Sequence, residues 1–140
     1  MSLVSINNSY HFWFMEELPE SPAHLIPYNQ EQAIIEETAA QLQKDFGEFS
    51  FSIVFTGKHE TPYRELFDQV LPIVELMLRN EPSMMNAMLY RIDVSEGMIK
   101  KFSLTNPGIP FPTLLTDLIL RREMQKVLTR RYFKEKKGCQ

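Results

Sequence analysis

The feature that most constrains the fold of this chain is the helical spacing of its apolar residues. Apolar side chains recur every three or four positions within segments 29–47, 61–79 and 113–134. This spacing places them on one side of a helix, where they can pack against a neighbouring helix. In the first segment the apolar series is Ile35, Ala39, Leu42 and Phe46. We therefore predict a mainly α fold with four to five helices around one core.

Residues typical of helix ends support these segments. Asn29 is placed to accept hydrogen bonds from the first turn, and Gly47 is expected to supply a left-handed stop. Thr61 has the character of an N-cap, and Pro62 follows at a position where a missing N–H costs nothing. Pro72 falls on the polar side of the second helix, so we predict a bend there rather than a break.

Residues 49–56 alternate between apolar and polar side chains. This alternation, together with the aromatic and β-branched composition, predicts a short strand with one buried face. A single strand leaves backbone groups unpaired, so it needs a partner. We consider three partners: the N-terminal aromatic residues, a segment near 88–94, or the same strand of a second subunit. A small α+β domain is therefore the alternative fold.

The segment 83–94 fits two structures. Its apolar residues match helical spacing after a Ser83 cap, and they also match the alternation of a strand. We favour a helix, because Ser95 looks like the start of a further short helix that reaches about Phe102. Segment 105–112 contains Asn-Pro-Gly and two more prolines, so we expect a loop.

Residues 1–28 differ in composition from the rest of the chain. They contain an aromatic cluster at positions 10–14, and three prolines follow between positions 19 and 27. Proline at this density favours extended backbone. We expect an N-terminal aromatic and proline-rich arm over 1–28, followed by a single globular helical domain over 29–137.

The cysteine content and the N-terminal sequence bear on the compartment. Cys139 is the only cysteine, so an internal disulfide is impossible, which fits a reducing environment. The apolar run at 11–15 is too short for a signal peptide or a membrane span. We expect a soluble cytoplasmic protein that has no membrane partner.

Charge is distributed unevenly along the chain. Residues 121–137 contain eight basic and two acidic residues, a net charge of +6, within a chain of net charge −3. This pattern fits a polyanion-binding helix, or a basic helix neutralised by an acidic body. We favour the second interpretation, because the isoelectric point near 5.6 is low for a nucleic-acid binder. The candidate polyanion-binding residues are Arg122, Lys126, Arg130 and Arg131.

No catalytic, cofactor or metal motif is complete. Gly57 and Lys58 suggest the end of a phosphate loop, but Ser52 stands where the first glycine is required. The three histidines, His11, His24 and His59, lie on separate segments without a second ligand at metal-binding spacing. We therefore predict no catalytic residue, no cofactor and no metal, and we do not expect an enzyme.

The sequence favours a non-enzymatic protein-interaction or structural domain that can self-associate. The candidate interaction arm comprises Tyr10, Phe12, Trp13 and Phe14. Large rings exposed to water form an apolar patch, so we expect them to dock on a protein surface. The partner is then another protein or a second copy of this chain. The alternative is a nucleic-acid-binding module that uses the basic C-terminal helix.

Overall fold

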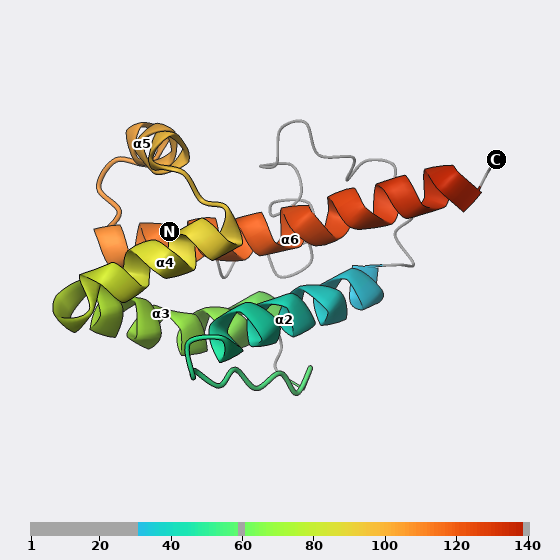
Figure 1. Ribbon diagram of the computed structural model, residues 1–140, viewed down its shortest axis with the longest axis horizontal. Helices are drawn as coiled ribbons and strands as arrows, with labels where there is room; N and C mark the ends of the chain where they lie inside the picture. The colour runs from blue at the N-terminus through green and yellow to red at the C-terminus, as the bar shows by residue number, and fades with distance from the viewer. Residues whose placement is uncertain (1–30, 59–60, 139–140) are drawn as a thin grey trace.

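The structure is a computed structural model that describes residues 31–58 and 61–138, and the described residues are mainly α-helical (Figure 1). The mainly α prediction is therefore confirmed, with five helices within these residues. They are α2 (Glu31–Gly47), α3 (Pro62–Asn80), α4 (Pro82–Ile92), α5 (Glu96–Thr105) and α6 (Phe111–Gly138).

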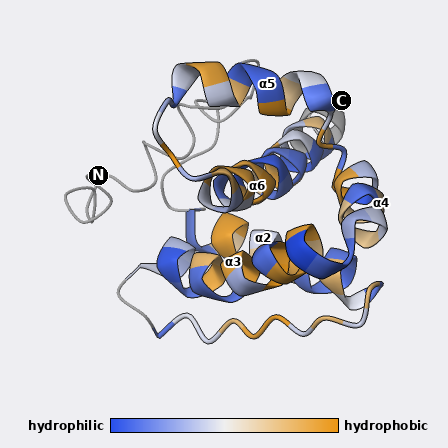
Figure 2. Ribbon diagram, turned by 90° about the vertical axis from the view of Figure 1, so that its left-hand side faces the viewer, coloured by the Kyte–Doolittle hydropathy of each residue, from blue (hydrophilic) through white to orange (hydrophobic). Residues whose placement is uncertain are grey.

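Helix α6 lies at the centre of this arrangement. Viewed along its axis, α2 and α3 lie on one side of α6, α5 lies on the opposite side, and α4 closes the third side (Figure 2). The first half of α6 is apolar nearly all round, which suits a helix with neighbours on several sides. The buried apolar residues in this half are Leu114, Leu115, Leu118, Ile119, Leu120 and Met124.

One hydrophobic cluster joins α2, α3, α4 and α6. The predicted apolar face of α2 is buried, as Phe46 at its C-terminal end illustrates. Four methionines are buried in the same cluster, which fits the use of this unbranched side chain to fill irregular gaps. They are Met77, Met85, Met88 and Met124. Helix α5 has no fully buried residue, and it covers the cluster with Met98, Ile99 and Phe102.

The predicted strand at 49–56 is wrong, and so is the α+β alternative. Residues 51–56 follow an extended path (Figure 2), but no strand occurs within the described ranges 31–58 and 61–138. Side chains from the helices take the place of a neighbouring strand. The Gln69 amide donates to Val54 O over 2.6 Å and accepts from Val54 N over 2.8 Å. Gln43 donates to Ile53 O, so the extended backbone needs no second strand at these positions.

A carboxylate completes the support of this extended segment. Glu65 on α3 accepts hydrogen bonds from the backbone N–H groups of Thr56 and Gly57, at 2.8 and 3.1 Å. The alternation of apolar and polar residues at 49–56, which suggested a strand, reflects which side chains of this segment are buried. Ile53 is buried against the core, whereas Val54 is 57% exposed. Alternate side chains of any extended segment face opposite sides, whether or not the backbone pairs with another strand.

The left-handed stop of α2 is at Ser50 and not at Gly47. Ser50 has a φ of 67°, its N–H donates to Gly47 O, and Phe51 N donates to Phe46 O. This pair of bonds is the Schellman arrangement. Helix α4 ends in the same way, with Asp93 at a φ of 70°. Serine and aspartate hold two positions at which glycine is the commonest residue.

Helix starts follow the predictions in part. Thr61 precedes α3 and Pro62 begins it, as predicted, but the Thr61 side chain makes no capping bond to this helix. Residues 83–92 of the ambiguous segment 83–94 are helical, as favoured, but α4 begins at Pro82, so its N-cap is Glu81 and the predicted Ser83 cap is wrong. Ser95 caps α5 as expected, since its side chain accepts from Met98 N.

Three further features bear on the predicted organisation. Helix α3 runs without interruption through Pro72, which lies on the exposed side. The loop between α5 and α6 matches the predicted one, although α6 begins slightly earlier, at Phe111. The predicted cap at Asn29 and the arm over 1–28 lie outside the described residues.

Candidate functional site: a buried carboxyl pair and the end of helix α6

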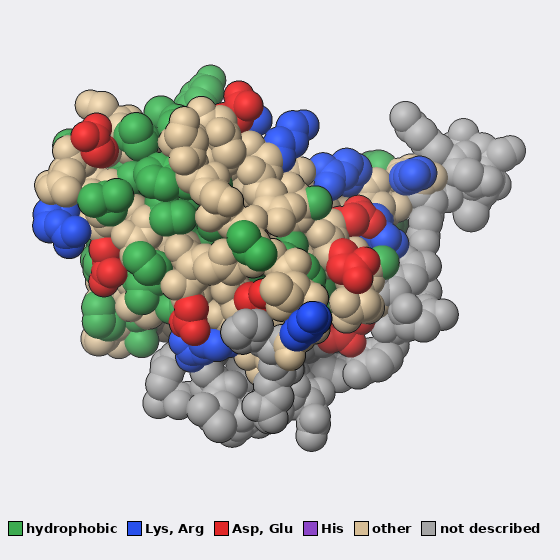
Figure 3. All heavy atoms as spheres, turned by 90° about the horizontal axis from the view of Figure 1, so that it is seen from below, with side chains coloured by type: hydrophobic (Ala, Val, Ile, Leu, Met, Phe, Trp, Pro, Cys, Tyr) green, Lys and Arg blue, Asp and Glu red, His purple; other side chains and the backbone are tan. Residues whose placement is uncertain are grey.

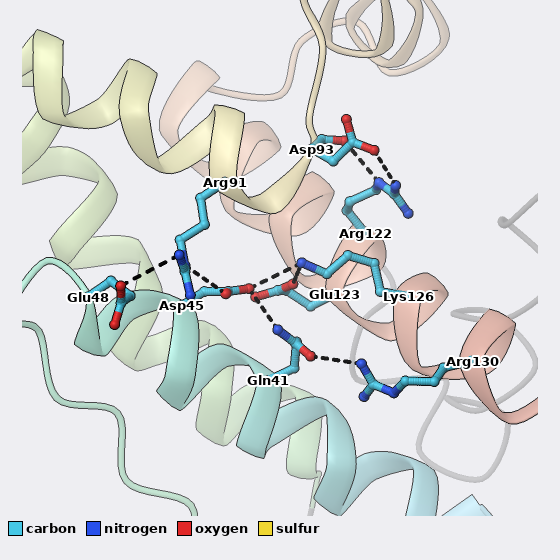
Figure 4. A network of polar contacts seen from close by, with 9 residues as sticks. All are labelled: Gln41, Asp45, Glu48, Arg91, Asp93, Arg122, Glu123, Lys126 and Arg130. Carbon is cyan, nitrogen blue, oxygen red and sulfur yellow. Dashed lines mark hydrogen bonds and ion pairs between the residues drawn. The ribbon is translucent and has the colours of Figure 1, made fainter.

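Two acidic side chains are buried where α2 packs on α6. Asp45 lies on α2 and is 3% exposed, and Glu123 lies on α6 and is 0% exposed. Around them gather cations and an amide from three helices (Figure 4). Burying a charged group is costly unless partners compensate it, so the contacts of each carboxyl group decide its state.

Asp45 receives three donors. Lys126 Nζ is 3.1 Å and Gln41 Nε2 is 3.1 Å from Asp45 Oδ2, and Arg91 Nε is 3.0 Å from Oδ1 (Figure 4). Burial alone would raise the pKa of Asp45. Hydrogen bonds from Glu123, Gln41 and Lys126, together with the charge of Lys126, outweigh burial and lower this pKa from 3.8. Asp45 is therefore ionised at neutral pH.

Glu123 is in the opposite state. Its pKa is raised from 4.5 to about 8, mainly by burial and also by the hydrogen bond and negative charge of Asp45, against the opposing effect of Lys126. Lys126 Nζ is 2.7 Å from Glu123 Oε1, but no described donor reaches either Glu123 oxygen in hydrogen-bonding geometry. This environment suits a protonated carboxyl group that donates to Asp45. At neutral pH the pair therefore shares one proton and carries one negative charge.

This pair can hold helices together, but it is poorly placed for reaction chemistry. Both carboxyl groups are buried, so a substrate would have to open the α2–α6 interface to reach them. Within residues 31–58 and 61–138, no group of three or more His, Cys, Asp or Glu residues could hold a metal ion. The chemistry available to the pair is the uptake and release of one proton, which couples the packing of α2 on α6 to pH.

The first two predicted polyanion-binding residues contact carboxylates of this protein. Arg122 Nη2 is 2.7 Å from Asp93 Oδ2, and Arg122 Nε donates to Asp93 O over 2.9 Å (Figure 4). These bonds hold Asp93, the C-cap residue that follows α4, against α6. Lys126 contacts both members of the carboxyl pair, as described above.

The other two cations connect α6 to α2. Arg130 Nη1 is 3.1 Å from the Gln41 amide oxygen, and Arg131 Nε is 2.7 Å from Glu37 Oε2. The structure thus aligns all four cations on α6, where each contacts a neighbouring helix or its end. Polyanion binding stays a prediction, and a polyanion would have to compete with these contacts.

Sequence reasoning missed Asp45, Glu123 and Arg91. A signal for the two acids was nevertheless present. Asp45 adjoins Phe46 on the apolar face of its helix, and Glu123 lies three positions after Leu120 and next to Met124. A charged residue inside a buried helical stripe is rare unless it has a partner. Residue spacing could not identify that partner, because Asp45 and Glu123 come from opposite ends of the described chain.

The C-terminal end of α6 projects beyond the other helices. It extends past the first residue of α2 (Figure 1). Phe133 on this end is 56% exposed, and its ring lies edge-on to Tyr132 at a centroid distance of 5.3 Å. Arg130 and Lys134 are also exposed. Lys and Arg side chains gather toward this end of the molecule, with acidic side chains beside them, whereas exposed hydrophobic side chains are more frequent toward the opposite end (Figure 3).

The predicted interaction arm residues Tyr10, Phe12, Trp13 and Phe14 lie outside the described residues, as do the three histidines. Comparison with known proteins adds no assignment: no family model, no curated protein and no solved structure matches this chain. Among the described helices, none is both long enough and apolar enough to cross a membrane.

Proposed function

We propose that this chain is a non-enzymatic protein-interaction domain that assembles with a second copy of itself. The observation that carries the proposal is the exposed Phe133 ring on the projecting end of α6 (Figure 1). Aromatic side chains and arginine are enriched at protein interfaces, and an aromatic residue is a frequent anchor at the centre of one.

The dimensions of α6 support this proposal. At 1.5 Å per residue, its 28 residues span about 42 Å, whereas the 17 residues of α2 span about 26 Å. A helix of this length gains little from its last turns unless they pack against something. A second copy can provide that surface, and twofold symmetry would bury two such ends at once.

The buried carboxyl pair fits a structural role beside this surface. Asp45 and Glu123 are enclosed by α2 and α6, so we assign them to the stability of the domain rather than to catalysis. The single cysteine, Cys139, supports a further proposal that the domain works in the reducing cytoplasm.

Sedimentation velocity of the full chain over a wide concentration range tests the proposal. We expect a mass that rises toward twice that of one chain, and we expect Phe133→Glu to remain a monomer. Tyr90→Glu is the matched control, because Tyr90 is 88% exposed on α4 and lies away from the end of α6. A wild-type chain that stays monomeric at every concentration would contradict self-association.

Nucleic-acid binding remains the second candidate, because basic side chains gather at one end of the molecule (Figure 3). It predicts tight binding of labelled oligonucleotides in fluorescence anisotropy, with a steep loss of affinity as salt rises. Arg130→Glu and Lys134→Glu together should then abolish binding. A chain that does not bind at low salt excludes this candidate and leaves the protein partner.

A further inference from the structure

We propose that the acidic aromatic segment 10–20 of one copy binds the projecting end of α6 in a second copy. This inference rests on the proposed self-association and names the two surfaces that meet. The receiving surface consists of Phe133 with the exposed side chains Arg130 and Lys134.

Charge complementarity is the first argument. Segment 10–20 contains Glu16, Glu17 and Glu20 and has no lysine or arginine. The receiving surface has the opposite sign, and the sequence beyond it continues with Lys136 and Lys137. Arg130 contacts the neutral Gln41 amide, so this contact leaves its positive charge available to a carboxylate. Complementary charges orient two surfaces and select the partner that carries the opposite sign.

The aromatic side chains are the second argument. Segment 10–14 reads Tyr-His-Phe-Trp-Phe, and the receiving surface presents an edge-to-face ring pair, Tyr132 and Phe133, of which Phe133 is the exposed member. Aromatic rings prefer offset or edge-to-face neighbours, and cations such as Arg130 stack on ring faces. One segment can therefore satisfy both the apolar and the basic parts of this surface.

The length and stiffness of the connection favour a second copy over the same chain. Helix α2 begins at Glu31, and it runs alongside the second half of α6, as the contacts of Arg130 and Arg131 with α2 show. Ten residues lie between Glu20 and Glu31, so the connection has eleven residue-to-residue steps. Prolines at 22 and 27 favour an extended connection, which at 3.1 Å per residue covers about 34 Å. A connection of this length between Glu20 and Glu31 carries the aromatic residues away from the start of α2, and therefore away from the neighbouring end of α6 in the same chain. The end of α6 in a second copy is then the surface that we propose they reach.

Trp13 provides a built-in reporter, because it is the only tryptophan in the chain. We expect its fluorescence in the full chain to be blue-shifted and poorly quenched by acrylamide at high concentration, and to shift to the red as dilution separates the copies. Lys134→Glu and Phe133→Ser should each give the red-shifted spectrum at a concentration at which the wild type is assembled. Tyr90→Glu, the matched control, should leave the spectrum unchanged.

A charge exchange makes the test specific. Lys134→Glu combined with Glu16→Lys and Glu17→Lys should restore the blue-shifted spectrum, because opposite charges face each other again. Far-UV circular dichroism checks that each variant keeps its helices.

Each remaining outcome decides against the inference. Self-association that leaves Trp13 emission unchanged overturns the inference but not the proposed function. A blue shift that persists in the monomer places the segment on its own chain and overturns the exchange between copies. A chain that never self-associates overturns both.

Discussion

Two positions on α6, ten residues apart in the sequence, reverse the usual relation between residue type and environment. Glu123 is a charged residue type and is fully buried, whereas Phe133 is aromatic and 56% exposed. The first position is explained by partners within the chain, Asp45 and Lys126. For the second we propose a partner outside the protomer. The comparison teaches that a buried acid or an exposed aromatic ring is a sign of a binding partner. For Glu123 the contacts within the chain identify that partner, whereas for Phe133 they leave the ring exposed.

Among the substitutions compared at neutral pH, the largest loss of stability is expected from removing the cation that both carboxyl groups share. Lys126→Met should lower the free energy of unfolding by about 3 kcal/mol at neutral pH, because a buried charge pair is broken on one side only. Chemical denaturation measures this change. Lys100→Met is the control, since Lys100 is exposed on α5. Equal stability of the two variants would show that Lys126 does not compensate the buried acids.

A smaller loss is expected from Asp45→Asn. The amide keeps the shape of the side chain but loses the charge that faces Lys126 and Arg91, so we expect a cost of about 2 kcal/mol at neutral pH. The pKa of Asp45 is lowered by folding, so its contribution is present above 3.8 and is lost as pH falls through the folded-state pKa. The variant and the wild type should therefore approach equal stability in acid. A difference that persists undiminished there would contradict this interpretation.

The pH dependence of stability tests the protonated state of Glu123. Its pKa is raised from 4.5 to about 8, so the folded state binds more protons than the unfolded state between these values. Stability should fall as pH rises through this window, by at most about 1.4 kcal/mol per pH unit, and then level off. Glu123→Gln mimics the protonated form, so it should flatten the slope and be more stable than the wild type at pH values above about 8.

The control for this experiment is Glu37→Gln, because Glu37 also connects α2 to α6, through Arg131, and is partly exposed. It should leave the slope unchanged. If Glu123→Gln were less stable than the wild type at every pH, Glu123 would be an ionised partner of Lys126, and the shared proton would be excluded.

The smallest effect on stability is expected at the exposed end of α6. Phe133→Glu should change the free energy of unfolding of the monomer by less than about 0.5 kcal/mol, since exposed positions contribute little to packing. If the same variant also abolishes self-association in sedimentation velocity, Phe133 contributes to assembly and Glu123 to the stability of the monomer, as the comparison of the two positions proposes. A large loss of monomer stability would mean that Phe133 belongs to the core, and the contrast with Glu123 would disappear.

Much of the helical architecture was predictable, because helix formation and burial of a stripe both follow from local spacing. The start of α3 is the clearest case, since Thr61 and Pro62 mark it in the sequence. The error at 49–56 has a physical cause. Period-two alternation records which side chains are buried, but it cannot tell whether a strand or the side chains of Gln69 and Gln43 satisfy the backbone.

The candidate site was less predictable than the fold. The cations at 122, 126, 130 and 131 were recognised from their clustering, but their partners lie on α2 and at the end of α4. The two buried acids were missed, because a carboxyl group in a helical stripe has no assigned partner until another helix packs against it.

The sequence by itself determined the helical class of this protein and the apolar faces of its main helices, since both depend on residues a few positions apart. It also determined the charge contrast between segment 10–20 and the end of α6. Only the tertiary structure decided that Asp45 and Glu123 share a proton next to Lys126, and that Phe133 remains exposed. The physical reason is that protonation and burial depend on groups brought close in space, and residues distant in sequence supply most of them.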